Sequence, residues 1–260
     1  MQIDKNIAAV VTGGASGLGK ASVQALARAG AKVAIFDLNE EAGTRLAQEV
    51  GGVFCKVDIL NEESVLAGFE KARAAHGQER ICVHCAVVCK GARTVSKNKE
   101  TGQLKRMTTE DFAFSAQGVL IASYRVASIS ALGMAAAEPL EDGERGVIIL
   151  TSSTASMEPQ IGQVAYGALK AGVNGLVLSM ARDLMDNGIR VNSILPGIFA
   201  TPPMLGVPAK VLEGLAASVP FPKRLGKPEE FGSLVLEMSR NLYFNGNAVR
   251  LDGALRMAAR

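Results

Sequence analysis

The 260-residue sequence lacks a long hydrophobic run. No apolar stretch reaches the roughly 18 to 20 residues that a helix needs to cross a bilayer, and the opening MQIDKN lacks the features of a signal or transit peptide. These absences favour a cytoplasmic protein without a membrane partner. The sequence also has no internal repeat, no low-complexity tract and no linker long enough to separate two domains. We therefore expect residues 1–260 to form a single domain.

Net charge is also low. Lysine and arginine total 28 and aspartate and glutamate total 25, giving a formal charge of +3 that is too small over this length to favour nucleic acid as the main partner. Hydrophobic residues make up 48% and charged residues 20% of the chain, which excludes the composition of a disordered protein. The composition is instead typical of a globular protein with a substantial core.

Cysteine occurs only four times, but Cys82, Cys85 and Cys89 surround His84, so a metal site has to be considered. The segment has the composition of a buried strand, on which successive side chains alternate between faces. Cys82 and Cys85 would then point in opposite directions, which does not suit shared metal ligation. We expect reduced core thiols and no bound metal.

Short apolar runs alternate with longer segments of helical period from Ile7 to the C-terminus. This alternation predicts an α/β fold, namely a single-domain, Rossmann-type, doubly wound parallel sheet of about seven strands flanked by helices. Because such strands are buried on both faces, they are continuously apolar. The predicted strands are Ile7–Thr12, Lys32–Asp37, Val53–Val57, Ile81–Cys85, Val147–Thr151, Arg190–Leu195 and Ala248–Arg250, and the predicted helices include Gly17–Ala29, Glu62–His76, Gln163–Met185 and Pro228–Arg240.

Two segments interrupt the alternation. Val87–Thr109 is polar and basic, and Pro196–Pro222 is rich in proline. Long loops without structure of their own tend to be functional, and both segments follow the carboxyl ends of strands, where doubly wound sheets bind ligands. The first segment is either a solvated loop or a surface that attracts an anionic ligand. Its charged residues are the single anion Glu100 and the cations Lys90, Arg93, Lys97, Lys99, Lys105 and Arg106.

A glycine-rich turn follows the first predicted strand, where Thr12 leads into Gly13-Gly14-Ala15-Ser16-Gly17-Leu18-Gly19. Glycine lets the backbone turn tightly and approach a pyrophosphate, while the N-terminus of the next helix offers free N–H groups to the anion. Asp37 ends the second strand, where a carboxylate can bind a ribose 2′-hydroxyl but would repel a 2′-phosphate. The pattern predicts NAD rather than NADP. Asp58, which ends the third strand, either meets the adenine or merely caps the next helix.

Tyr166 and Lys170 are four residues apart in YGALK, within a segment of helical period, so they share one helix face. A nearby ammonium favours the phenolate and brings the pKa of tyrosine towards the working range of an acid–base catalyst. Ser153 follows the fifth predicted strand and can reach Tyr166 only through tertiary folding. Taken alone, a tyrosine and a lysine at this spacing are more often a surface pair.

These motifs occur in the order and spacing of the short-chain dehydrogenase/reductase family, which the chain resembles over essentially its whole length. The resemblance rests on TGGASGLG, Asp37, the interval from Ser153 to Tyr166, YGALK, and PGIFATP from Pro196 to Pro202. Three further segments, GQVAYGALKAG, VPFPKRLGKPEEF and VRLDGALRM, are most similar to the branch of type II 3-hydroxyacyl-CoA dehydrogenases, also called type 10 17β-hydroxysteroid dehydrogenases. The resemblance implies an NAD-dependent oxidoreductase that interconverts a secondary alcohol and a ketone. It further implies an acyl-CoA substrate and a homotetramer.

The resemblance also implies residue roles. Tyr166 is the general acid–base, Lys170 lowers its pKa and binds the nicotinamide ribose, Ser153 polarises the carbonyl, and Gln163 faces the substrate. The basic Lys90–Arg106 segment matches an insertion near the substrate entrance of that branch. The residues expected to bind NAD are Gly13, Ser16, Gly17, Leu18, Gly19, Asp37, Asp58, Ile59, Cys85, Ala86, Tyr166, Lys170, Pro196, Gly197, Ile198 and Thr201.

The chain departs from the family pattern at two places. His84-Cys85-Ala86-Val87 replaces the family's Asn-Asn-Ala-Gly, and the central helix, which reads FSAQGVL, lacks the asparagine that supports a proton relay to the lysine. Gln117 is the nearest amide that could substitute, although its extra methylene shifts the polar atoms. These departures keep a second hypothesis open, in which the protein binds NAD as a scaffold or sensor with little catalysis.

Overall fold

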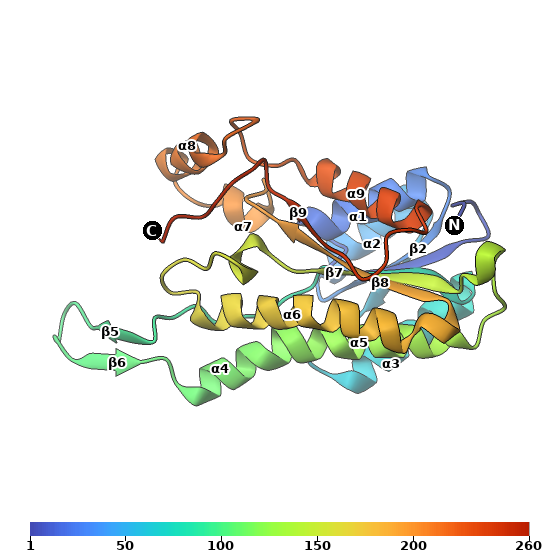
Figure 1. Cartoon of the computed structure of the whole chain (residues 1–260), viewed down its shortest axis with the longest axis horizontal. Helices are drawn as coiled ribbons and strands as arrows, with labels where there is room; N and C mark the ends of the chain where they lie inside the picture. Colours follow the sequence, from blue (N-terminus) through green and yellow to red (C-terminus); the bar gives the residue numbers. More distant parts are fainter. Residues whose placement is uncertain (260) are drawn as a thin grey trace.

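The computed structural model describes residues 1–259, and its centre is a parallel sheet of seven strands (Figure 1). The strand order is β3-β2-β1-β4-β7-β8-β9, so the direction of winding reverses between β1 and β4. Such a reversal leaves a crevice at the carboxyl ends of the strands. The strands are β1 (Ala8–Thr12), β2 (Lys32–Asp37), β3 (Val53–Lys56), β4 (Glu79–His84), β7 (Gly146–Thr151), β8 (Ile189–Pro196) and β9 (Ala248–Leu251).

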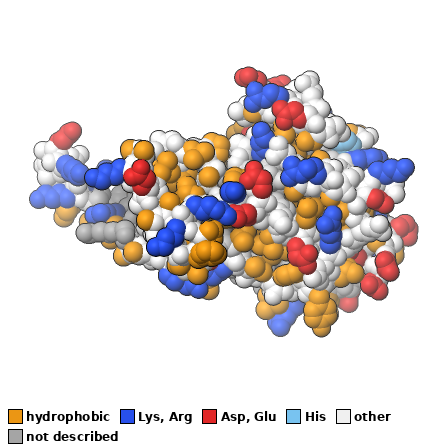
Figure 2. Space-filling view, turned by 90° about the horizontal axis from the view of Figure 1, so that it is seen from above, with side chains coloured by type: hydrophobic (Ala, Val, Ile, Leu, Met, Phe, Trp, Pro, Cys, Tyr) orange, Lys and Arg blue, Asp and Glu red, His pale blue; other side chains and the backbone are white. Residues whose placement is uncertain are grey.

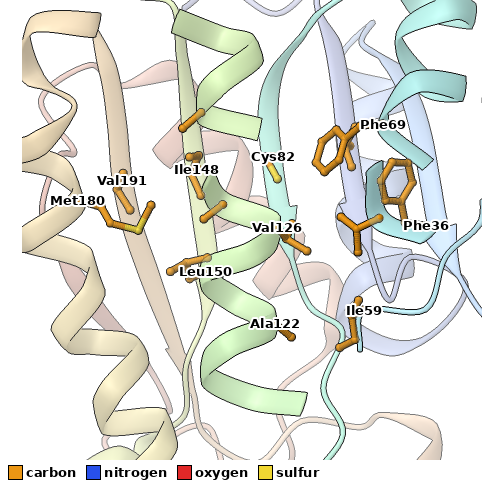
Figure 3. Close-up of a cluster of buried hydrophobic side chains, with 14 of the residues drawn as sticks. Phe36, Ile59, Phe69, Cys82, Ala122, Val126, Ile148, Leu150, Met180 and Val191 are labelled. Atoms are coloured by element: carbon orange, nitrogen blue, oxygen red, sulfur yellow. The ribbon is translucent and has the colours of Figure 1, made fainter. Parts of the chain in front are cut away.

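Helices cover both faces of the sheet. On one face, α1 (Gly17–Arg28), α2 (Glu40–Val50) and α9 (Pro228–Arg240) pack on a cluster that includes Val11, Val83 and Ile149. On the other face, α3 (Glu62–His76), α5 (Ala122–Ala135) and α6 (Val164–Asp183) enclose a second cluster, drawn in Figure 3. There Cys82, Ile148 and Leu150 of the sheet point towards the helices. Alternate residues of one strand therefore face opposite cores, which explains the continuous apolar runs.

The predicted elements are confirmed in kind and place. Lys32–Asp37, Glu62–His76 and Pro228–Arg240 begin and end where the sequence pattern placed them, and the other predicted strands and helices agree within two residues at each end. Fold class and single-domain architecture are thus as expected. The differences lie in frayed ends, where a terminal residue retains few backbone hydrogen bonds.

The two interrupting segments are more structured than a loop. Val87–Thr109 contains an antiparallel hairpin of β5 (Val95–Lys97) and β6 (Leu104–Arg106), which projects from the body beyond α4 (Thr109–Ala116) in Figure 1. Pro196–Pro222 contains α7 (Pro202–Leu205) and α8 (Ala209–Ser218). The interpretation of both as long loops without structure of their own was wrong. Pro202 and Pro203 start α7, where a missing N–H costs nothing, so here proline begins a helix rather than excluding one.

The central helix changes its winding between α4 and α5 (Ala122–Ala135). Residues Gln117–Ile121 form a π-helical segment between α4 and α5. Within it, the Gly118 carbonyl accepts a hydrogen bond from the backbone N–H of Val88, in the segment that follows β4 (3.1 Å). Because Gly118 has no side chain, the helix can approach that segment closely. π-Segments of this kind often lie at functional sites.

Two helical spans are long and apolar enough, by length and composition alone, to cross a membrane: residues Thr109–Ala135 and Val164–Asp183. Half of the first window and 44% of the second are buried within the protein. Helices that pack on a core sheet pass the same test, because one face of each must be apolar.

Candidate active site

A cavity of about 390 Å³ opens at the carboxyl ends of β1, β2 and β4, on the side of the winding reversal. It brings together segments that are far apart in the sequence, as a doubly wound sheet should. Most residues predicted to bind a dinucleotide line it. Its full lining is Gly13, Ser16, Gly17, Leu18, Gly19, Phe36, Asp37, Leu38, Val57, Asp58, Ile59, Cys85, Ala86, Val87, Val88, Thr201, Pro202 and Pro203.

The glycine-rich turn needs its glycines. Gly13 has a φ of +63°, and a Cβ there would come within 2.9 Å of the Ala86 backbone nitrogen. Gly17 also has a positive φ, of +52°, at the first turn of α1. The preceding residue, Ser16, is exposed and its side chain makes no capping hydrogen bond, so the first N–H groups of α1 remain available. The cradle therefore fits the pyrophosphate of a dinucleotide.

Asp37 is held in place by the turn that it faces. Its carboxylate accepts hydrogen bonds from the backbone N–H of Ala15 (3.0 Å) and of Asn39 (2.9 Å). Each carboxylate oxygen can accept more than one hydrogen bond, so both retain capacity for a ribose diol. The adjacent residue in the cavity, Leu38, is 58% exposed and offers an apolar surface to a base.

The alternative role of Asp58 as a helix cap is wrong. The cap of α3 is Asn61, whose side chain accepts from the Ser64 N–H (3.0 Å). Asp58 instead accepts from the N–H of Leu60 (2.9 Å) and lines the cavity beside Ile59. Its carboxylate is thus oriented by a local turn and is free of the helix, as a residue that contacts an adenine requires.

Tyr166 and Lys170 lie on one face of α6, and the Lys170 ammonium is 5.8 Å from the centre of the Tyr166 ring. Ser153, just beyond the end of β7, lies close enough to the phenol for its hydroxyl to lower the pKa of Tyr166. The Ser153 oxygen also accepts from the Ala155 N–H (3.1 Å), which fixes its rotamer. Tertiary folding therefore brings the three predicted catalytic residues together from two elements.

Burial dominates the titration of this pair. The pKa of Tyr166 is raised, because burial outweighs the hydrogen bond from Ser153, and Lys170 is not among its causes. Burial also lowers the pKa of Lys170 from 10.5 to about 8. The sequence predicted that the Lys170 ammonium lowers the pKa of the Tyr166 phenol. This prediction is not met in the protein by itself. The physical reason is that Nζ donates to the backbone carbonyl of Thr151 (2.5 Å) rather than facing the phenolic oxygen.

A second hollow lies beside the phenol. Tyr166 lines it together with Gln163, the residue predicted to face the substrate, and with Val87, Cys89, Gly91 and Gly162. The Gln163 side chain is anchored, because its Oε1 accepts from the backbone N–H of Gln160 (2.9 Å). Neither Cys89, considered only as a metal ligand or core thiol, nor Val87, considered only as a departure from Asn-Asn-Ala-Gly, was predicted from the sequence to lie beside the substrate. Their place directly after the fourth strand is the signal that could have found them.

Three residues predicted to line the nicotinamide side lie outside the cavity at the glycine-rich turn. Pro196 pairs with Leu251 in the ladder between β8 and β9, and Gly197 lies against Asp252, where a Cβ would come within 2.8 Å of the aspartate Cβ. Ile198 lines a separate cavity of about 230 Å³. Of this group only Thr201 reaches the cavity at the glycine-rich turn, together with the following prolines. β8 runs one residue further than expected, to Pro196, and Gly197 stays beside β9 by donating to the Leu251 carbonyl (2.9 Å).

Comparison with known proteins agrees with this geometry. The family model described as enoyl-(acyl carrier protein) reductase matches residues 13–255. The 3-hydroxyacyl-CoA dehydrogenase type-2 of Drosophila melanogaster is 42% identical over 255 residues, covering 97% of this chain and 98% of that protein. The human protein of the same name is 41% identical, covering 97% and 96%. The crystal structure of 3-hydroxyacyl-CoA dehydrogenase type-2 from Mycobacterium avium superposes with a TM-score of 0.92 at 41% identity, covering both chains completely.

The chain belongs to the short-chain dehydrogenase/reductase family. It is an oxidoreductase of this family, and membership implies a nicotinamide cofactor and a small-molecule substrate. The resemblance inferred from TGGASGLG, Asp37 and YGALK is thereby confirmed, including the branch to which it pointed.

The segment that departs from the family's Asn-Asn-Ala-Gly is held to the neighbouring strands by hydrogen bonds. The Ala86 N–H donates to Thr12 Oγ1 (3.3 Å), and the Thr151 hydroxyl donates to Cys85 Sγ (3.3 Å), so backbone and side chain are both tied to neighbouring strands. Gln117 does not replace the missing relay asparagine, because its side chain is exposed whereas Lys170 is buried.

The cysteines behave as core thiols. Cys82 belongs to the cluster under α5 and α6, and Cys85 packs against the opposite cluster, as strand alternation predicted. Burial raises the pKa of Cys82 to about 12 and that of Cys85 to about 11, so both are protonated near neutral pH. Among residues 1–259 no group of three or more histidine, cysteine, aspartate or glutamate side chains is placed to share a metal ion.

Proposed function

We propose that this enzyme uses NAD(H) to interconvert a secondary alcohol and a ketone, with a 3-hydroxyacyl-CoA and 3-oxoacyl-CoA pair as substrates. The observation that carries the proposal is the convergence of Ser153, Tyr166 and Lys170 beside the cavity lined by the glycine-rich turn and Asp37. The relatives named as 3-hydroxyacyl-CoA dehydrogenases support the choice of substrate class.

The residues divide the proton chemistry among them. The Tyr166 phenol exchanges a proton with the substrate oxygen, and the Ser153 hydroxyl donates a hydrogen bond to that oxygen as its charge changes. The Lys170 ammonium lies over the Tyr166 ring. It favours the phenolate form of Tyr166 when Nζ turns towards the phenolic oxygen. NAD, held by the glycine-rich turn and Asp37, would supply the hydride acceptor for oxidation of the alcohol, and its reduced form the hydride donor for the ketone.

Asp37 supports the choice of NAD. Its carboxylate already accepts from Ala15 and Asn39, which orients the remaining lone pairs towards the cavity, where a ribose diol can donate to them. A 2′-phosphate would place two negative groups side by side. The next two residues, Leu38 and Asn39, bring no positive charge to offset that repulsion.

The basic hairpin supports an acyl-CoA. Figure 2 shows lysine and arginine side chains gathered on the projecting end of the molecule, and Glu100 is the one acidic residue of the Lys90–Arg106 segment. A bridge between Ala92 and Gln163 ties the base of the hairpin to the hollow beside Tyr166. Lys90 pairs with Asp111, which lies outside the segment, so Glu100 is not the only counter-charge and Lys90 is neutralised. The cations left to attract CoA phosphates are Arg93, Lys97, Lys99, Lys105 and Arg106.

We further propose a homotetramer assembled through the exposed faces of the long helices. Apolar side chains lie exposed from α4 to the residues just after α6. Monomeric proteins rarely expose a continuous apolar surface of this kind. A membrane would also have to take up the charged side chains that border this surface on the same helices. In an oligomer, neighbouring copies of the chain cover the apolar surface instead. The exposed residues are Phe112, Phe114, Ile121, Tyr124, Leu132, Val164, Leu178 and Met185.

The deciding experiment follows the oxidation of NADH by acetoacetyl-CoA in the wild type and in Tyr166→Phe. We expect turnover in the wild type and its loss in the variant, with NADH affinity nearly intact because the hydroxyl acts on the substrate. Gln117→Ala serves as a matched control on an exposed position. Turnover retained in Tyr166→Phe would overturn the acid–base role, and NADH binding without turnover in the wild type would favour the scaffold or sensor hypothesis.

A further inference from the structure

His84 is a buried polar side chain that the chemistry described above does not use. It lies at the carboxyl end of β4 and is 2% exposed. Strand alternation places its ring on the same sheet face as Cys82, under α5 and α6. Its Nδ1 lies 2.8 Å from Thr12 Oγ1, while Nε2 is buried with no hydrogen-bond partner among residues 1–259. A polar atom in this position costs stability unless it is satisfied.

The charged group nearest to the His84 ring is the ammonium of the catalytic residue Lys170. His84 pairs in register with Leu150 of the adjacent strand, and the carbonyl of the next residue, Thr151, accepts from Lys170 Nζ. Neighbouring strands are about 4.8 Å apart, so the imidazole and the ammonium occupy the same small region of the site floor. An ammonium carries three donors, and the Lys170 side chain makes a single hydrogen bond within the described residues. Each group thus has unused hydrogen-bonding capacity next to the other.

The ring is neutral at physiological pH. Burial, followed by the positive charge of Lys170, lowers the pKa of His84 to about 3. Cys85 and Cys89 are the other titratable groups that act on Lys170, and both tend to raise its pKa. The Gln117–Ile121 segment of the central helix brings no titratable side chain, and β1 contributes only Thr12. His84 can therefore donate or accept a hydrogen bond, but it does not act as a general acid at this pH.

We propose that His84 is a positioning residue, which holds the Lys170 ammonium through one bridging water molecule bound between Nε2 and Nζ. The two nitrogens are not in direct hydrogen-bond contact. Water suits the link because it accepts from the ammonium and can either donate to Nε2 or accept from it, so both ring tautomers are satisfied. The Thr12 hydroxyl fixes the ring orientation. This inference rests on the catalytic role proposed for Lys170.

Two substitutions separate the ring nitrogens. His84→Asn keeps a polar atom near the position of Nδ1, and with it the bond to Thr12, but removes the group at Nε2. His84→Gln places an amide near Nε2. The first measurement is an NMR titration of ¹⁵N-labelled lysine side chains without cofactor or substrate, with the Lys170 signal assigned by its loss in Lys170→Met.

We expect the pKa of Lys170 to fall by about one unit in His84→Asn, because the charged amine loses a hydrogen-bond partner, and to stay near the wild-type value in His84→Gln. Cys82→Ala, two residues earlier on the same face, is the control for packing loss and should leave this pKa unchanged. An unchanged pKa in His84→Asn, or equal shifts in both histidine variants, would make His84 a structural residue only.

The second measurement is the pH profile of kcat for alcohol oxidation. In His84→Asn its ascending limb should move to higher pH by about one unit, while KM for the alcohol stays close to the wild-type value. A lower kcat with an unmoved limb would contradict the proposal. Since the titration requires no turnover, it decides the link between His84 and Lys170 even if the proposed substrate is wrong.

Discussion

The Lys170 ammonium donates to the Thr151 carbonyl at 2.5 Å, at the end of the strand that precedes Ser153. The Ser152 hydroxyl completes the contact by donating to the Lys170 carbonyl (2.9 Å). The lysine is therefore held by the sheet at both its backbone and its amine. Lys170 is 4% exposed, so its charge is buried in the protein interior. Burial of this charge lowers the free energy of unfolding, as is common for residues of a functional site.

This cost predicts that Lys170→Met stabilises the protein near neutral pH. Burial lowers the pKa of Lys170 from 10.5 to about 8, so the folded state binds fewer protons than the unfolded state between these values. The penalty is fully present below about pH 8 and disappears as the pH rises through 10.5. We expect Lys170→Met to raise the free energy of unfolding by on the order of 1–3 kcal/mol at pH 7 and by little at pH 10.5, measured by urea unfolding. A gain that is independent of pH would contradict this origin.

Asp37 is predicted to select NAD through its charge. Asp37→Asn keeps one oxygen, which can accept from the N–H of either Ala15 or Asn39, loses the other acceptor, and removes the repulsion of a 2′-phosphate. We expect NADP affinity to improve by roughly tenfold while NAD affinity weakens, as measured by calorimetry. Adding Leu38→Arg to Asp37→Ala should narrow or reverse the preference further. Equal affinity of the wild type for the two cofactors would refute the assignment.

The hairpin is predicted to act on CoA substrates through long-range attraction. Changing Lys97, Lys99 and Lys105 to Gln should raise KM for acetoacetyl-CoA at low salt and have little effect at high salt, because exposed charges are screened over about 8 Å at physiological ionic strength. KM for a neutral ketone of similar acyl shape should not change.

The matched control for the hairpin replaces Lys5, Lys32 and Lys71 with Gln. These lysines are exposed and none lines the cavity, so the net charge changes equally without altering the field at the site. A rise in KM for both substrates would indicate general damage. No rise at all would leave the hairpin as a solvated surface and favour a small uncharged alcohol or steroid as substrate.

Arg190 is predicted to be a major determinant of stability. At the start of β8 its guanidinium binds Glu144 through Nε (3.0 Å) and Nη2 (2.8 Å) and donates to backbone carbonyls that include those of Met238 and Phe244 (both 2.7 Å). Removing the guanidinium leaves the buried Glu144 paired only with the N-terminal ammonium (3.1 Å) and leaves these backbone carbonyls without their donor, so Arg190→Met should cost about 3–5 kcal/mol in urea unfolding. Arg256→Met, at a side chain that is 62% exposed, should cost less than about 1 kcal/mol.

The sequence alone determined the class of fold, because period and length distinguish strands from helices without knowledge of their contacts. Lys32–Asp37 and Glu62–His76 were located to the residue, since each is bounded by a cap or turn that acts locally. The cofactor cradle was predictable for the same reason, as Gly13 and Gly17 must adopt backbone conformations that only glycine takes easily.

Tertiary structure decided what depends on distant contacts. Whether Tyr166 faces Ser153, how deeply Lys170 is buried, and which carbonyl its ammonium finds are set by the packing of α6 on β7, and burial then moves both pKa values in directions that spacing could not show. The hairpin, the exposure of Gln117 and the unpartnered nitrogen of His84 likewise emerge only when strands and helices meet. Local conformation is encoded in neighbouring residues, whereas desolvation and hydrogen-bond partners are properties of the packed whole.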